Sequence, residues 1–239
     1  MTTLPQGFDA TSYATVWRHA ALIADPNDTT KPSKQNAWFA FGSAWTGMAF
    51  RLRAARELSD DFGRLIAVSS APPDEDLYLQ ERALFGCIVS ALSAVECFYM
   101  ATHCLAAEVA PQHFRLLEDK DLKGDIPQIT DRYVAWAPSD DFTRELKQVS
   151  VSSRLCSLTD LRNVLAHRGT LTRQHFLSTV RDVPSTIPSK PKLLHRNLRH
   201  GAPLSAETTS THVQWVSETC SRLVGSFSQF LSRTTSHDA

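Results

Sequence analysis

The sequence lacks the residue patterns of several common functional sites. Its nine glycines are scattered and form no Gly-rich phosphate loop, and its nine histidines include no His-Glu-x-x-His motif. The five cysteines are odd in number and include no Cys-x-x-Cys pair, which indicates small core residues in a reducing compartment. We therefore expect no metal site, no cofactor and a cytoplasmic location.

Long apolar runs and a secretory signal are also missing. The most apolar stretch, residues 83–95, is followed at once by Glu96 and is too short to cross a bilayer. The first residues do not show the basic region and apolar stretch of a secretory signal. We interpret residues 83–95 as part of a core helix and expect no membrane span.

The chain has no excess charge of either sign, with 25 Lys and Arg against 25 Asp and Glu over 239 residues. Together with an apolar fraction of 42%, this excludes a disordered chain and predicts one large domain, with or without an extension. The neutral total does not exclude a nucleic acid, because the charges are segregated. Residues 170–204 hold six basic residues and one acid, a net charge of +5, and the rest of the chain carries −5.

Apolar residues at helical spacing predict an all-α fold, with no strand pattern above noise. We expect helices over residues 8–24, 37–58, 76–110, 111–119, 141–168 and 205–233, an irregular stretch over 120–138, and a long basic loop over 170–204. The poor helix formers of residues 149–153 suggest a break in the fifth helix. Pro72 and Pro73 mark a boundary, so we predict an N-terminal helical extension over 1–75 and a helical bundle over 76–239.

The end of the helix over 141–168 carries the sharpest chemical pattern in the chain, Arg162-Asn163 followed by His167. Arg162 and His167 lie about 140° apart around a helix, whereas Asn163 and His167 are neighbours one turn apart. An imidazole that moves a proton beside an arginine that binds phosphate suits phosphodiester chemistry. The alternative is structural: Arg162 makes an interhelix ion pair, and His167 caps the carbonyl groups at the helix end.

This pattern resembles the motif of the HEPN superfamily (higher eukaryotes and prokaryotes nucleotide-binding). That motif is an Arg, a polar residue that is often Asn, and a His a few residues later, after a long amphipathic helix. Here residues 163–166 separate Arg162 from His167, and the Ala-rich stretch around Glu96 is similar to the first helix of many members. The resemblance covers residues 76–233.

The resemblance implies an up-and-down bundle that forms a homodimer, with a metal-independent ribonuclease site shared by the two copies. Arg162 would bind the scissile phosphate, His167 would act as base or acid, and Asn163 would position them, supported by Glu96 and Arg168. The product would be a 2′,3′-cyclic phosphate, and the setting a toxin–antitoxin or antiviral defence system with an antitoxin or defence-complex partner. Some toxin members carry a Tyr two residues after the His, where this chain has Gly169.

Basic residues next to the motif predict an RNA-binding segment, whose alternative is a solvated loop. They are Arg173, Arg181, Lys190, Lys192, Arg196 and Arg199. An aromatic group of Trp38, Phe39, Phe41 and Trp45 is a stacking platform for bases or, more commonly, a core stripe. Two other functions stay open: a helical module that binds a nucleotide or protein without turnover, and a structural subunit that docks through its N-terminal aromatic helix.

Overall fold

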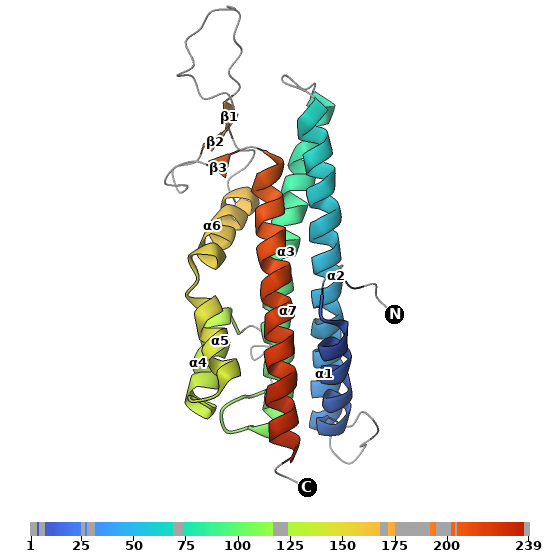
Figure 1. Ribbon diagram of the computed structural model, residues 1–239, viewed down its shortest axis with the longest axis vertical. Coiled ribbons are helices and arrows are strands. Elements are labelled where there is room, and N and C mark those ends of the chain that lie inside the picture. Colours follow the sequence, from blue (N-terminus) through green and yellow to red (C-terminus); the bar gives the residue numbers. More distant parts are fainter. Residues whose placement is uncertain are drawn as a thin grey trace, which may run out of the picture. The chain divides into compact units, whose positions relative to one another are not determined.

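The computed structural model describes residues 4, 8–24, 27, 32–68, 74–116, 124–167, 172–174, 192–194, 202–203 and 205–236. Over these residues the chain forms seven α-helices and three short strands, shown in Figure 1. In chain order they are α1 (Ala10–Ile23), α2 (Pro32–Val68), α3 (Asp74–Val109), α4 (Ile126–Trp136), α5 (Asp141–Ser150), α6 (Ser153–His167), β1 (Thr172–Gln174), β2 (Lys192–Leu194), β3 (Ala202–Pro203) and α7 (Ala206–Ser236). The predicted all-α class is confirmed in its main feature, since every long element is a helix.

The chain divides into two compact units, each built from several segments. The first comprises residues 1–53, 93–155 and 216–239, and the second comprises residues 54–92 and 156–215. The long helices α2, α3 and α7 each contribute one part to each unit. The predicted boundary at residue 75 falls in the first turn of α3 and stays a prediction.

Aromatic side chains form the core of the first unit. Phe98 of α3 packs edge-to-face on Phe142 of α5 and Phe227 of α7, with ring centroids 6.3 and 6.2 Å apart. Trp45 of α2 stacks on Tyr13 of α1 at 4.8 Å. Because Phe41 and Trp45 are fully buried, they belong to this core, whereas Phe39 is 67% exposed.

In the second unit, the end of α2 packs on the start of α3. Gly86 permits this contact, because a β-carbon there would lie 2.8 Å from Cδ1 of Leu58. The buried amide of Gln80 donates a hydrogen bond of 3.1 Å to the carbonyl oxygen of Leu65. Ser59 of α2 also donates a hydrogen bond of 2.9 Å to Thr209 of α7. These bonds fix α2 against both neighbouring helices.

The expected helices over residues 8–24, 37–58, 76–110 and 205–233 are confirmed as α1, α2, α3 and α7, although α2 is longer. The break suspected near residues 149–153 is also confirmed, because Val151 and Ser152 separate α5 from α6. Asp9 caps α1 by accepting a hydrogen bond of 2.9 Å from the backbone of Ser12, which explains its start.

Three local predictions are wrong. A helix was predicted over residues 111–119, but residues 111–113 form a turn and residues 114–116 have no regular structure, whereas residues 117–119 lie outside the described residues. The stretch predicted to be irregular contains α4, whose start is capped by Asp125 and followed by Pro127, a position where proline favours a helix. Within the expected basic loop, β1, β2 and β3 form a small antiparallel sheet in the order β1-β2-β3, with Arg173 paired to Leu193 and Lys192 to Pro203.

One stretch of α3, residues 75–109, is long and apolar enough to cross a membrane by length and composition. Of the 18-residue apolar window within it, 61% is buried within the protein. The side chains of Leu84, Ile88, Val95 and Phe98 are fully buried. We therefore describe α3 as a helix whose apolar residues pack against the chain's own helices.

Candidate functional site

Helix α6 carries the predicted site residues at its end. Its start follows a short break, where the hydroxyl of Ser152 accepts a hydrogen bond of 3.2 Å from the backbone of Arg154. Its buried face consists of Leu155, Leu158, Leu161 and Val164. This apolar face holds α6 against the protein up to the turn that contains the motif.

Arg162 and Asn163 lie side by side after the buried Leu161, and both are half-buried. Arg162 takes part in an interaction within the protein, so it is not a free cation. The backbone stays helical through His167, which places His167 one turn after Asn163. The structure describes the backbone of His167 and not its side chain.

The supporting residues are distributed over the chain. Glu96 is an exposed residue of α3 in the first unit, whereas Arg162, Asn163 and His167 belong to the second unit. Glu96 also has an interaction partner in the protein. Its role beside Arg162 therefore stays a prediction.

The basic segment is described only in part. Arg173 lies in β1 and Lys192 in β2, and these two strands pair through Arg173–Leu193 and Gln174–Lys192. The pairing brings two of the six predicted RNA-binding positions onto neighbouring strands. The described residues do not include the other positions of this segment and of the motif's end, namely Arg168, Gly169, Arg181, Lys190, Arg196 and Arg199.

Among the described residues there is no group of three or more His, Cys, Asp or Glu side chains that could hold a metal ion. His103, the most deeply buried histidine that the structure describes, serves the core. Its Nε2 lies 3.0 Å from the carbonyl oxygen of Arg115, and its Nδ1 lies 3.3 Å from Nη1 of Arg132. His103 is therefore a residue of the core.

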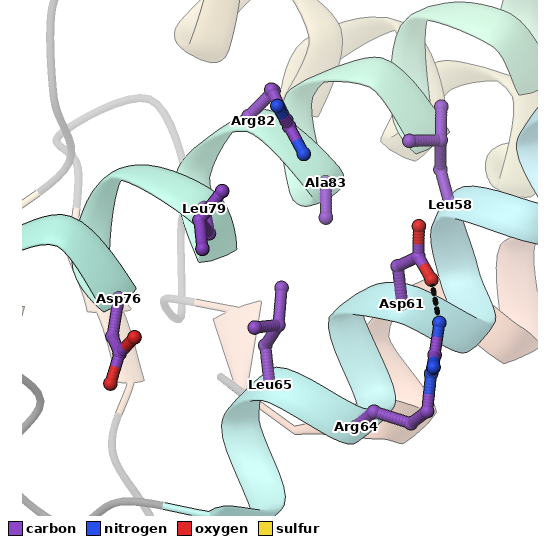
Figure 2. A pocket seen from close by; sticks show the side chains of 8 residues that line it. All are labelled: Leu58, Asp61, Arg64, Leu65, Asp76, Leu79, Arg82 and Ala83. Atoms are coloured by element: carbon purple, nitrogen blue, oxygen red, sulfur yellow. Dashed lines mark hydrogen bonds and ion pairs between the residues drawn. The ribbon is translucent and has the colours of Figure 1, made fainter.

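Sequence reasoning did not find a pocket of about 370 Å³ between the end of α2 and the start of α3. Figure 2 shows its apolar lining, in which Leu65 of α2 points across the pocket toward Leu79 and Ala83 of α3. The remaining lining residues are Leu58, Asp61, Arg64, Asp76 and Arg82. Leucines at positions 58, 65 and 79 were visible in the sequence, but only the contact between the two helices shows that they surround a pocket.

The rim of the pocket carries equal numbers of acidic and basic side chains. Arg64 forms an ion pair with Asp61, drawn as a dashed line in Figure 2. Asp76 and Arg82 have no hydrogen bond or ion pair with any residue that the structure describes. Among the described residues, the rim therefore presents one carboxylate and one guanidinium without an ion-pair partner, above an apolar lining.

The resemblance to the HEPN superfamily rests on Arg162, Asn163 and His167 and on their place at the end of a leucine-rich helix. Comparison of the chain with protein-family models, with curated proteins and with solved structures found no match.

Proposed function

We propose that this protein is a metal-independent endoribonuclease of the HEPN type that cleaves RNA with Arg162 and His167. The observation that carries the proposal is the helical setting of the motif. Helix α6 is continuous through His167, and its buried leucines hold the last turn against the protein. Arg162 and Asn163 are half-buried, which limits the directions their side chains can take.

The chemistry requires no group beyond these side chains and the RNA. His167 removes the proton of a 2′-hydroxyl, whose oxygen attacks the neighbouring phosphorus as the bond from phosphorus to the 5′-oxygen of the next nucleotide breaks. The imidazolium of His167 then returns the proton to the 5′-oxygen that leaves. Arg162 stabilises the charge that develops on the phosphate oxygens. Asn163, one turn before His167, orients the imidazole. The products are a 2′,3′-cyclic phosphate and a 5′-hydroxyl.

The proposal includes a setting for this reaction. The protein is a cytoplasmic homodimer with an up-and-down bundle, in which both copies contribute to one cleft. The basic residues 170–204 attract the RNA backbone, because their net charge of +5 favours phosphate. Its biological role is that of a toxin or a phage-defence effector, silenced by an antitoxin or by a defence-complex partner.

A second candidate is a helical module that binds a nucleotide or a protein partner without turnover. The observation that favours it is that Arg162 already has an interaction partner within the protein. An arginine held in this way can bind a phosphate or stabilise the fold without taking part in a reaction.

The test is cleavage of mixed RNA in the presence of EDTA. Arg162→Ala and His167→Ala should each lower the cleavage rate about 100-fold or more, because each removes a group used in the transition state. The matched control is Arg154→Ala, which removes an exposed arginine from the first turn of the same helix. This control should cleave like the wild type, and the products should carry cyclic phosphate ends.

Equal cleavage by the wild type and both site variants would refute the proposal. RNA or nucleotide binding that requires Arg162, without cleavage by any variant, would instead establish the binding module. Toxicity on overexpression that depends on both residues would support a toxin or defence role.

A further inference from the structure

The pocket between α2 and α3 lies within the second unit and leaves apolar surface in contact with water. Its apolar lining consists of Leu58, Leu65, Leu79 and Ala83. The three leucines are only half-buried, although each lines the pocket. A ligand that covers them gains free energy from the apolar area that it removes from water.

The charged rim of the pocket differs between the two helices. On α2, Arg64 is paired with Asp61. On α3, neither Asp76 nor Arg82 has a hydrogen bond or ion pair with any residue that the structure describes. Figure 2 shows these two side chains on either side of Leu79. Because Asp76 and Arg82 are six residues apart, their α-carbons are separated by about 9 Å along the helix axis.

The two charges of α3 indicate the charges of the ligand. A ligand that fills the pocket displaces water from Asp76, which is already half-buried, and from Arg82. A charge that loses its water needs a partner of the opposite sign. The ligand therefore carries a cationic group for Asp76 and an anionic group for Arg82. The rim as a whole has a formal charge of zero, with two aspartates and two arginines, so it does not suit a polyphosphate or a nucleic acid.

The size of the pocket suits a small ligand. Its volume of about 370 Å³ lies near the lower end of the range for ligand pockets. A stable protein interface buries about 800 Å² on each partner, which is more than the four apolar side chains of this lining supply. An extended peptide covers about 3.3–3.6 Å per residue, so three residues span roughly 10 Å. The ammonium and carboxylate groups at the two ends of such a peptide are thus separated by about the spacing of Asp76 and Arg82.

We propose that the pocket between α2 and α3 binds a short apolar peptide of about three residues whose two ends are both free. The ammonium group of the peptide pairs with Asp76, and its carboxylate pairs with Arg82. Its apolar side chains pack on the leucines of the lining. None of these residues belongs to the proposed ribonuclease motif, so each proposal can fail without the other.

The first test is isothermal titration calorimetry of the full chain with the peptide Leu-Ala-Leu. We expect one peptide per chain, with a dissociation constant of about 100 µM or lower. Acetylation of the amino end or amidation of the carboxyl end of the peptide should each weaken binding about tenfold or more, because each leaves one charge of the pocket without a partner. Free leucine is too short to reach both charges and should also bind about tenfold more weakly or worse.

Two variants of the protein show which end of the peptide binds where. Asp76→Asn should weaken binding of the free peptide about tenfold and leave binding of the acetylated peptide unchanged. Arg82→Gln should have the same effects on the free and the amidated peptide. The matched controls Glu75→Gln and Arg56→Gln alter exposed charges that do not line the pocket and should bind like the wild type. Circular dichroism checks that all four variants are folded.

The second test maps the site with the same peptide, in which a photo-reactive diazirine replaces one leucine side chain. Irradiation should link the peptide to residues 58–65 or 76–83. Cross-links to other segments, or no saturable binding up to about 1 mM, would overturn the proposal. Equal binding of the free and blocked peptides, or wild-type binding by Asp76→Asn and Arg82→Gln, would refute the pairing of charges. Free leucine that binds as tightly as the peptide would replace the peptide by a single amino acid and so also overturn the proposal.

Discussion

A single buried histidine shows how much one residue contributes to the first unit. His103 is fully buried and lies between the carbonyl oxygen of Arg115 and the guanidinium of Arg132. A carbonyl oxygen only accepts and a guanidinium only donates, so Nε2 carries the proton and Nδ1 accepts. The ring therefore joins α3, the turn after it and α4.

We predict that His103→Leu lowers the free energy of unfolding by about 1–3 kcal/mol. The leucine removes both hydrogen bonds and leaves the carbonyl of Arg115 and an N–H of Arg132 without these partners. Denaturant unfolding of the purified protein measures the change. The control is His113→Leu, which alters a half-buried histidine of the same turn. If His103→Leu unfolds at the same denaturant midpoint as the wild type, this role of His103 is refuted.

At the scale of the helices, two aspartates decide where α4 and α5 begin. Asp125 accepts a hydrogen bond of 2.9 Å from the backbone of Gln128, and Asp140 accepts one of 2.8 Å from Phe142. Asp140 also forms an ion pair of 2.9 Å with Arg233 of α7. Asp140 thus has two separable roles, as the cap of α5 and as a link between α5 and α7.

Substitutions at position 140 should separate these roles. Asp140→Asn keeps an acceptor for the cap and loses the ion pair, so it should cost about 0.2–1 kcal/mol, the range for an exposed pair. Asp140→Ala loses both and should cost about 1 kcal/mol more, the typical value of a cap. Thermal or denaturant unfolding of both variants and of Arg233→Ala checks the order. Equal stability of the Asn and Ala variants would exclude the capping role.

At the scale of the whole molecule, buried thiols make the stability of the fold depend on pH in the alkaline range. Cys87 lies in the second unit, and Cys104 and Cys220 lie in the first. Burial raises the pKa of each of these thiols from 9.0 to about 12, and at Cys87 the charge of Asp60 adds to the effect. Burial likewise raises the pKa of Tyr13 to about 12.

The sign of the pH effect follows from these raised pKa values. The unfolded chain loses its thiol protons near pH 9, whereas the folded protein keeps them until about pH 12. The contribution of these thiols to the free energy of unfolding should therefore be fully present below pH 9. It should be lost between pH 9 and 12, by about 1.4 kcal/mol per pH unit for each thiol. Denaturant unfolding under reducing conditions across this range measures the slope.

The thiol contribution can be isolated with a triple variant, Cys87→Ala, Cys104→Ala and Cys220→Ala. Its stability should fall less steeply above pH 9, and the remaining slope comes from tyrosines such as Tyr13. The control Cys156→Ser alters an exposed cysteine and should keep the slope of the wild type. An identical slope in the triple variant would show that these thiols do not control alkaline unfolding.

Part of the fold follows from local patterns, and the errors have physical causes. The helices α1, α3 and α7 were predictable because their apolar residues recur at helical spacing over many turns. Helix α4 was missed because Gly124 and Pro127 suggest an irregular stretch, although Pro127 lies in the first turn after the Asp125 cap. The strands within residues 172–203 were not predicted, because strands of two or three residues are too short to show an alternating pattern.

For the candidate site, the sequence by itself determined the order Arg162, Asn163 and His167 and their relative angles, because helix geometry depends only on spacing. It also determined the segregation of charge into residues 170–204. Only the tertiary structure decided that Arg162 is half-buried with a partner, that His103 belongs to the core, and that Leu58, Leu65 and Leu79 surround a pocket. Burial and pockets arise where segments distant in sequence meet, and a local pattern carries no information about which segments those are.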